Sequence, residues 1–221
     1  MIKIIIICEG LTEERFVKEI LQPHFKVRDI ILKAREIGGA NRYPKIKQEI
    51  IIQLNADKNS YVSTMIDLYG MNNDFPGYTV ASKNVGIAAL QKVEDIETAI
   101  LTDILTADRL YNKKFIPYIQ LHEFEALLFS ETQKLEDSLR LDNLALKENA
   151  FENIRNKFET PEHINDSRHT APSKRIKNLV PAYDKITDGM KIAADIGLQK
   201  IREQCKHFND WITALENLKT F

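Results

Sequence analysis

The sequence is short of cysteine, of long apolar runs and of excess charge, and each shortage excludes a class of protein. Its 221 residues include two cysteines, Cys8 and Cys205, so no disulfide framework is expected. No apolar stretch approaches the roughly 20 residues that cross a membrane. The formal net charge of -1 at pH 7 provides no general field that attracts nucleic acid or anionic lipid. We therefore expect a cytoplasmic protein without membrane contact, whose nucleic-acid site, if it has one, is a local patch.

Motifs for two common kinds of site are missing as well. The chain has no "GxxxxGK[ST]" phosphate loop, so any use of ATP requires a partner protein. Its cysteines and histidines do not form the two pairs of a zinc site. We interpret Cys205 and His207 as packing beside Trp211. The sequence also contains no internal repeat and no low-complexity linker.

What the sequence does have is an alternation of apolar runs and helical patterns. Its N-terminal run is too short for a signal peptide and ends at Glu9, so we interpret it as the first strand. Strands are predicted at Ile2–Cys8, Asp29–Ile37, Tyr61–Ile66 and Phe115–Leu121. Helices are predicted at Thr12–Pro23 with Thr12 as the cap, at Pro44–Leu54, from Val93 to Leu105, and in "HEFEALLFSE". This order predicts an α/β fold with a mostly parallel sheet flanked by helices.

The C-terminal part of the chain has a different character. From residue 133 onward, helical patterns alternate with polar connections, and we predict no strand there. We therefore expect an α/β domain over residues 1–132 and a helical C-terminal region over residues 133–221. The helical region is either packed on the first domain or continuous with it as one domain.

Acidic residues follow three of the predicted strands, at the point where each strand ends. They are Glu9, Asp67, and Glu123 with its neighbour His122, while Glu13 follows Glu9 by one helical turn. If the strands are parallel neighbours, these side chains converge on the edge where α/β proteins bind ligands. Clustered carboxylates repel each other unless a cation neutralises them, and hard oxygen ligands suit Mg²⁺ or Mn²⁺. The alternative is that each acid only caps a helix or complements its dipole.

The residues after the fourth predicted strand leave two interpretations open. His122 is able to ligate a metal or move protons, or simply to hydrogen-bond the start of the next helix. On a helix, Glu123 and Glu125 point in different directions, so we do not expect both to reach one ion.

A basic segment, "HTAPSKRIKNL", is the best candidate for a contact with phosphate. We expect Ser173 to begin a helix whose backbone N–H groups, together with Lys174 and Arg175, bind an anion. Such contacts position a nucleic-acid backbone without reading its sequence. The alternative is a solvated helix start with ordinary surface charge.

These motifs resemble known families. The segment "IIIICEGLTEERF" is similar to the first motif of Toprim domains, and its EGxxE form resembles that of OLD-family nucleases. Along nearly its full length, the chain also resembles DUF4276, a Toprim-like bacterial family. The segments that carry this second resemblance are "EGLTEERFV", "STMIDLYGMNNDFPG", "LHEFEALLFS", "PEHINDSRHTAPSKRI" and "IGLQKIREQCKHF" with the Trp that follows.

The resemblance implies roles for individual residues. Glu9 takes the place of the Toprim glutamate that serves as metal ligand or general acid/base, and Glu13 that of the second acid of the OLD-type motif. Asp67 matches the first Asp of an Asp-x-Asp motif, but Tyr69 stands where the second Asp is expected. The residues that would supply the missing oxygen are Asp74, Glu123 and Glu125.

The function implied by the resemblance is metal-dependent cleavage of nucleic acid, as an effector in bacterial anti-phage defence. Mg²⁺ or Mn²⁺ held by Glu9 and Asp67, helped by Glu13 or Glu123, would activate water against a phosphate bound by the basic segment. An alternative is a non-catalytic binding or effector subunit that acts with a partner ATPase. A third hypothesis keeps the fold without the chemistry, which Tyr69 permits. A homo-oligomer is compatible with each of these.

Overall fold

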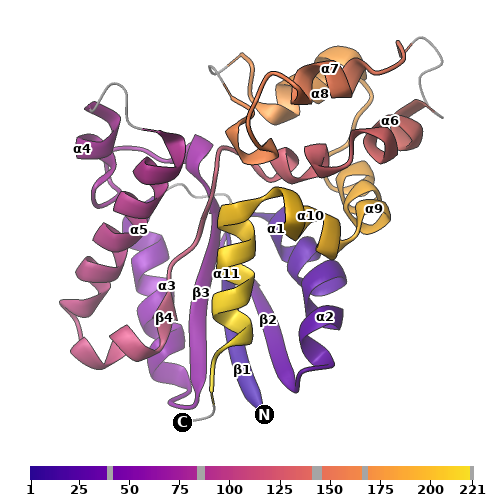
Figure 1. Ribbon diagram of the computed structural model, residues 1–221. Helices are drawn as coiled ribbons and strands as arrows, with labels where there is room; N and C mark the ends of the chain where they lie inside the picture. The colour runs from indigo at the N-terminus through magenta and orange to yellow at the C-terminus, as the bar shows by residue number, and fades with distance from the viewer. Residues whose placement is uncertain (39–41, 84–87, 141–145, 166–168, 220–221) are drawn as a thin grey trace. The chain divides into compact units, whose positions relative to one another are not determined.

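The computed structural model describes residues 1–38, 42–83, 88–140, 146–165 and 169–219 (Figure 1). The chain divides into two compact units. The first consists of Met1–Gln120 together with Ala214–Phe221, and the second of Leu121–Thr213. This division falls before the 132/133 boundary expected from the sequence, and the end of the chain groups with the sheet rather than with the helical region.

The first unit is built on a parallel sheet. Its strands are β1 (Ile2–Cys8), β2 (Ile30–Glu36), β3 (Ser60–Asp67), β4 (Phe115–Ile116) and β5 (Ile119–Gln120). The order is β2-β1-β3-β4, and β5 also pairs with β3. All described strand pairs are parallel, and Ile5 lies opposite Lys33 on one side and Val62 on the other. The predicted α/β class with a parallel sheet is confirmed.

The apolar pattern of each strand follows from its place in the sheet. The central strand β3 is buried at every position and β1 is buried from Ile4 to Cys8, so both faces require apolar side chains. The edge strand β2 instead alternates between buried and more exposed positions, with Lys33 and Arg35 turned toward solvent. Long β-branched runs therefore mark the centre of this sheet, and alternation marks its edge.

The fourth predicted strand is wrong as a single element. It is broken at Pro117 into β4 and β5, because proline has no N–H to donate to a ladder. Side-chain bonds replace the ladder at this point. The Tyr118 N–H donates to Thr64 Oγ1 at 2.9 Å, and the Thr64 hydroxyl donates to the Tyr118 carbonyl at 2.9 Å.

The first helix also differs from its predicted bounds. A continuous helical segment runs through α1 (Leu11–Phe16), a π turn (Val17–Leu21) and α2 (Gln22–Lys26). It begins before Thr12, with Gly10 as its cap, and it continues past Pro23. In the π turn the Gln22 N–H donates to the Val17 carbonyl five residues back. The wider turn lies directly before the proline that would interrupt an α-helix.

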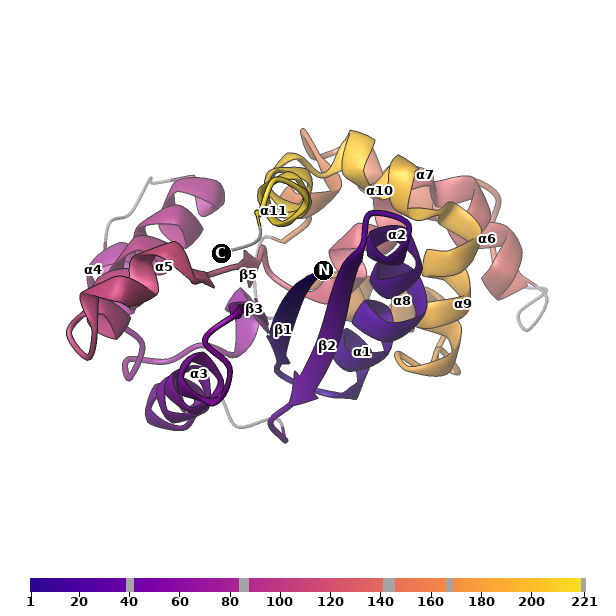
Figure 2. The same ribbon diagram turned by 90° about the horizontal axis from the view of Figure 1, so that it is seen from below.

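The other described helices of this unit come between β2 and β4 along the chain. They are α3 (Tyr43–Ala56), α4 (Tyr78–Lys83), α5 (Ala89–Leu105) and the 3-10 helices Leu68–Gly70 and Arg109–Lys113. In Figure 2, α3 and α5 lie on the opposite face of the sheet from α1 and α2. The buried stripe of α5 consists of Val93, Ile96, Ile100 and Ile104. The end of the chain is tied to this unit by the Tyr61 hydroxyl, which donates to the Lys219 carbonyl at 2.7 Å.

In its described residues, the second unit consists of helices and irregular connections, without a strand. Its elements are a 3-10 helix (Phe124–Ser130), α6 (Thr132–Arg140), α7 (Ala150–Arg155), a 3-10 turn (Pro161–His163), α8 (Pro172–Leu179), α9 (Thr187–Ile196), α10 (Leu198–Gln204) and α11 (Lys206–Glu216), whose last residues group with the first unit. The helix predicted in "HEFEALLFSE" is a 3-10 helix, and all seven of its residues are buried. None of the helices in the described residues is long and apolar enough to cross a membrane.

Candidate active site at the carboxyl edge of the sheet

Two of the predicted acids meet at the carboxyl edge of the sheet. Cys8 and Met65 are partners in the ladder of β1 and β3, and the Glu9 N–H donates to the Met65 carbonyl at 3.2 Å. The carboxylate of Glu9 then accepts a hydrogen bond from the Asp67 backbone N–H, with Oε2 at 3.1 Å. Asp67 is only 7% exposed, whereas Glu9 is half-buried. Adjacent parallel strands thus deliver two acidic residues to one edge, where the side chain of one contacts the backbone of the other.

Glu13 fixes the turn between Glu9 and the first helix. Its Oε2 accepts a hydrogen bond from the Gly10 N–H at 3.0 Å, in the arrangement of a capping box. The side chain is 3% exposed. Burial and the nearby charge of Glu13 raise the pKa of the Cys8 thiol, so this cysteine stays protonated and unreactive. The capping role expected as the alternative for Glu13 is therefore present in the structure.

The position of the missing second aspartate is open to solvent. Tyr69 lies in the 3-10 turn Leu68–Gly70 directly after Asp67, and its side chain is exposed. Asp74, one of the residues proposed to replace the missing oxygen, is exposed, and its carboxylate lies 3.9 Å from the Arg42 guanidinium.

The acids at this edge fit a hydrated divalent ion and not a closed metal cage. Among the described residues, no group of three or more His, Cys, Asp or Glu side chains is arranged to hold a metal. Mg²⁺ usually keeps several of its waters and is bound by one or two carboxylates together with substrate phosphates. Glu9 and Asp67 provide that number and kind of donor. The roles predicted for Glu9, Glu13 and Asp67 in metal binding and catalysis stay predictions.

In the second unit, Glu123 already occupies the helix start that was predicted to bind phosphate. Its Oε2 accepts a hydrogen bond from the Ser173 N–H at 2.9 Å, in the first turn of α8. Glu123 is buried, so the positive end of this helix is complemented by an internal carboxylate. A phosphate at this segment would depend on the side chains of Lys174 and Arg175 more than on the Ser173 N–H.

Two further buried glutamates that sequence reasoning missed cap helices in the same way. Glu136 accepts hydrogen bonds from the N–H groups of Asn149 and Ala150, at 3.1 and 3.0 Å, where α7 begins. Glu162 accepts from the N–H groups of His207 and Phe208, both at 3.0 Å, where α11 begins. Burial raises the pKa of Glu162, against the lowering effect of these two backbone bonds. The sequence near Glu136 or Glu162 gives little indication of this capping role, because each capped helix begins well after its capping acid in the chain.

Glu125 is the exception among the buried glutamates of the second unit. It is 0% exposed, and burial is the main cause that raises its pKa. Lys185 Nζ lies 3.4 Å from its Oε2 as an ion pair. Within the described residues, the two carboxylate oxygens of Glu125 have no hydrogen-bond partner. The hydroxyl of the buried Tyr183 has none either. Glu125 therefore does not cap a helix.

The other predicted side chains of this unit are held to different degrees. His122 has a φ of 63°, in the left-handed region where non-glycine residues are uncommon, and its Nδ1 lies 3.1 Å from Asn165 Nδ2. The Arg175 guanidinium lies 5.0 Å from the centre of the Phe158 ring, and its Nε donates to the Thr170 carbonyl at 2.6 Å. Lys174 is exposed. Arg175 is thus fixed against its own unit, while Lys174 extends into solvent.

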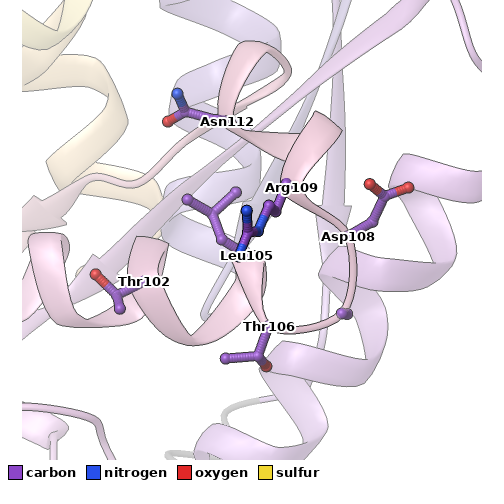
Figure 3. A pocket seen from close by; sticks show the side chains of 7 residues that line it. Thr102, Leu105, Thr106, Asp108, Arg109 and Asn112 are labelled. Carbon is purple, nitrogen blue, oxygen red and sulfur yellow. The ribbon is translucent and has the colours of Figure 1, made fainter.

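A surface cavity of about 650 Å³ lies in the first unit, at the end of α5 (Figure 3). It is lined by Thr102, Leu105, Thr106, Ala107, Asp108, Arg109 and Asn112. Its hydroxyls and carboxylate serve the local backbone. Thr102 and Thr106 donate to the carbonyls of Thr98 and Asp103, and Asp108 accepts from the Leu110 N–H. We assign no chemistry to this cavity.

A comparison with curated protein sequences found no match. Among solved structures, the chain is similar to crystals of the C-terminal region of the Xanthomonas campestris pv. campestris OLD protein, phased with iodine or with platinum. Identities are 12% and 13%, 97% of this chain and 98% or 95% of those chains are covered, and the TM-score is 0.37 in both cases. At this TM-score the likeness carries no argument about activity. The model of DUF4276, a domain of unknown function, matches residues 8–216, and the chain therefore belongs to the DUF4276 family.

Proposed function

We propose that this protein is a metal-dependent nuclease that hydrolyses phosphodiester bonds at the carboxyl edge of its sheet. The observation that carries the proposal is the meeting of Glu9 and Asp67, whose strands are neighbours and whose side chain and backbone are joined at 3.1 Å. Acids that are brought to one edge of a sheet repel each other, and a shared cation removes that repulsion. The carboxyl edge of a parallel sheet is also where α/β proteins place their ligands.

Each residue of the edge has a part in this proposal. A bound Mg²⁺ or Mn²⁺ would supply Lewis acidity toward a phosphoryl oxygen and would make water more acidic. Asp67 and Glu9 would hold the ion, and Glu9, the more accessible of the two, would face the substrate and accept a proton from the attacking water. Glu13 would act as a positioning residue, because its bond to Gly10 fixes the turn that carries Glu9.

The basic segment of the second unit has a separate place in this proposal, as a nucleic-acid contact of its own. Lys174 reaches solvent and would contact backbone phosphates, while Arg175, already stacked on Phe158, would add a fixed positive charge. Glu123 remains the internal ligand of the α8 helix start. The biological setting that suits such an enzyme is defence against bacteriophage.

The experiment that tests the proposal compares four forms of the purified chain with Mn²⁺ and single- and double-stranded DNA and RNA. Wild-type protein is expected to cleave at least one substrate, and Glu9→Gln and Asp67→Asn are each expected to reduce cleavage by about 10²-fold or more. Glu94→Gln, an exposed acid on α5, is the matched control and should cleave like the wild type. Cleavage that survives both site substitutions, or a wild type that cleaves none of the substrates, would overturn the proposal.

A second candidate is a non-catalytic nucleic-acid-binding subunit that acts with a partner ATPase. The observation that favours it is Tyr69, which stands exposed where the motif carries its second acid. Copurification of an ATPase with the tagged chain from its native host, together with nucleic-acid binding and no cleavage by the reconstituted complex, would support this candidate.

A further inference from the structure

The surface of this protein carries one exposed aromatic ring in its described part. Of the Phe, Tyr and Trp side chains that the structure describes, only Tyr69 is exposed, at 38%. The others are buried or half-buried, as expected for large apolar side chains. A single exposed ring does not indicate a binding site by itself, but the position of Tyr69 next to the candidate site does.

Tyr69 lies two residues after Asp67, and a second exposed apolar side chain repeats this spacing. Leu11 follows Glu9 by two residues, begins α1 and is 54% exposed. Because β1 and β3 are neighbours in the sheet, both side chains flank the edge where the two carboxylates meet. Each acid of the candidate site is thus followed by an apolar group in solvent.

The turn that carries Tyr69 is anchored on both sides. Leu68 and Met71 are buried, and the Met71 N–H donates to the Leu68 carbonyl at 3.2 Å. These contacts hold the 3-10 turn in place while the ring between them points away from the core. The exposure of Tyr69 is therefore built into the turn.

We propose that Tyr69, together with Leu11 after the neighbouring strand, is the surface on which a base of a single-stranded nucleic acid stacks. This inference rests on the proposed function and names its substrate class. The scissile phosphate would lie at Glu9 and Asp67, and the adjoining base would lie on the ring. Every base has a π face, so such stacking tolerates any sequence. Bases inside a duplex are already stacked and paired, so the site selects single strands.

The low net charge of the protein favours a contact of this kind. With a formal net charge of -1, the chain gains little general attraction for a polyanion, and the acids at the edge repel phosphate in the absence of a cation. Affinity must then come from local contacts, and stacking on an aromatic ring supplies it without charge. In this interpretation, Tyr69 replaces the second Asp of the Asp-x-Asp motif with a ring on which a base stacks.

The test measures binding of a short single-stranded oligonucleotide carrying 2-aminopurine, with Ca²⁺ in place of Mn²⁺ so that a cation is present at the edge carboxylates while cleavage is slow. Stacking on Tyr69 quenches the fluorescent base. Tyr69→Ala is expected to abolish the quenching and to weaken binding about tenfold or more, the loss typical of one base–aromatic contact. Tyr69→Phe keeps the ring and should bind like the wild type. Leu110→Ala, which removes a side chain that is 70% exposed at the opposite edge of the sheet, is the matched control.

Two results would overturn the inference, and both are independent of the nuclease proposal. One is a Tyr69→Ala variant that binds and quenches like the wild type. The other is a duplex of the same sequence that binds as tightly as the single strand. If binding depends on Tyr69 but no form of the chain cleaves, the stacking site stands and the nuclease fails. If cleavage depends on Glu9 and Asp67 but binding does not depend on Tyr69, the nuclease proposal stands and the stacking site fails.

Discussion

The two units of this protein bury carboxylates for different purposes. In the sheet unit, Glu9 and Asp67 come together at the ends of neighbouring strands. In the helical unit, Glu123, Glu136 and Glu162 each accept backbone N–H groups at the start of another helix. The comparison shows that a buried acid suggests a catalytic or metal-binding role only once the groups that donate hydrogen bonds to it are known. An acid that receives the N–H groups of a helix start is already neutralised by the fold.

The physical reason lies in the architecture of each unit. Helices α7 and α8 have 6 and 8 residues, and helices this short are marginal without capping and packing. A buried helix start leaves N–H groups that need acceptors, and an internal carboxylate provides two oxygens and a favourable charge. In the sheet unit, strand pairing satisfies the backbone of the strands themselves, and Glu9 and Glu13 each accept one further N–H group, from Asp67 and Gly10, where the strands end.

The largest effect that separates the two kinds of acid is expected on activity. Asp67→Asn should reduce cleavage by about 10²- to 10⁴-fold, the range typical of losing a group that acts in the reaction. Its stability should change little, because asparagine has nearly the same shape and keeps the backbone N–H that donates to Glu9. Glu136→Gln should keep its rate per folded molecule and lose stability instead. Initial cleavage rates and urea unfolding of both variants provide the comparison, and an Asp67→Asn variant that unfolds more easily but cleaves normally would contradict it.

The next largest effect is expected on the stability of the helical unit. Glu162→Ala should lower the free energy of unfolding by about 2–4 kcal/mol, because it leaves the buried N–H groups of His207 and Phe208 without their acceptor. Glu162→Gln keeps one carbonyl oxygen and should lose less. The exposed Glu203 on α10 offers a control, and its replacement by alanine should change stability little. Urea denaturation measures all three, and equal losses for Glu162 and Glu203 would contradict the capping role.

The sequence predicted the sheet well because its signals are local. The β-branched runs of β1 and β3 locate two buried strands to within a residue, and the order of elements indicates a parallel sheet. The errors also have physical causes. Pro117 interrupts the fourth strand, and the π turn before Pro23 lets the first helix continue. The 3-10 form of Phe124–Ser130 has no distinct apolar period, because all of its side chains are buried.

The site was only partly predictable for a related reason. Glu9 and Asp67 were found because strand ends in a parallel sheet share an edge, and a strand end is readable from the sequence. The capping partners of Glu162 lie 45 and 46 residues away, so no local pattern announces them. Glu123 and the Ser173 N–H that it accepts are also far apart in the sequence, so the sequence did not show that Glu123 already caps α8.

A smaller effect concerns Glu125, the buried acid that caps nothing. Burial raises the pKa of Glu125 above its ordinary value of 4.5, although Lys185 opposes the shift and Glu123 adds to it. The stability that this group contributes is therefore fully present below about pH 4.5 and is lost as the pH rises through the raised pKa. Glu125→Gln, which resembles the protonated form, should be at least as stable as the wild type at pH 7 and should flatten the pH dependence. Urea unfolding from pH 4 to pH 8 measures this (roughly the range of the linkage), and a variant less stable than the wild type at every pH would contradict it.

The smallest effect separates the side chains of the basic segment from its helix start. Because Glu123 already binds the Ser173 N–H, phosphate affinity should depend on Lys174 and not on the α8 dipole. Lys174→Ala should weaken oligonucleotide binding a few-fold and reduce the slope of log affinity against log salt by about 1. Lys191→Ala, an exposed lysine on α9, is the matched control and should leave the slope unchanged. A titration over several salt concentrations measures both slopes. If Lys174→Ala leaves the slope as it is in the wild type, the basic segment is ordinary solvated surface. The charged residues of the helical unit then have no part in binding nucleic acid.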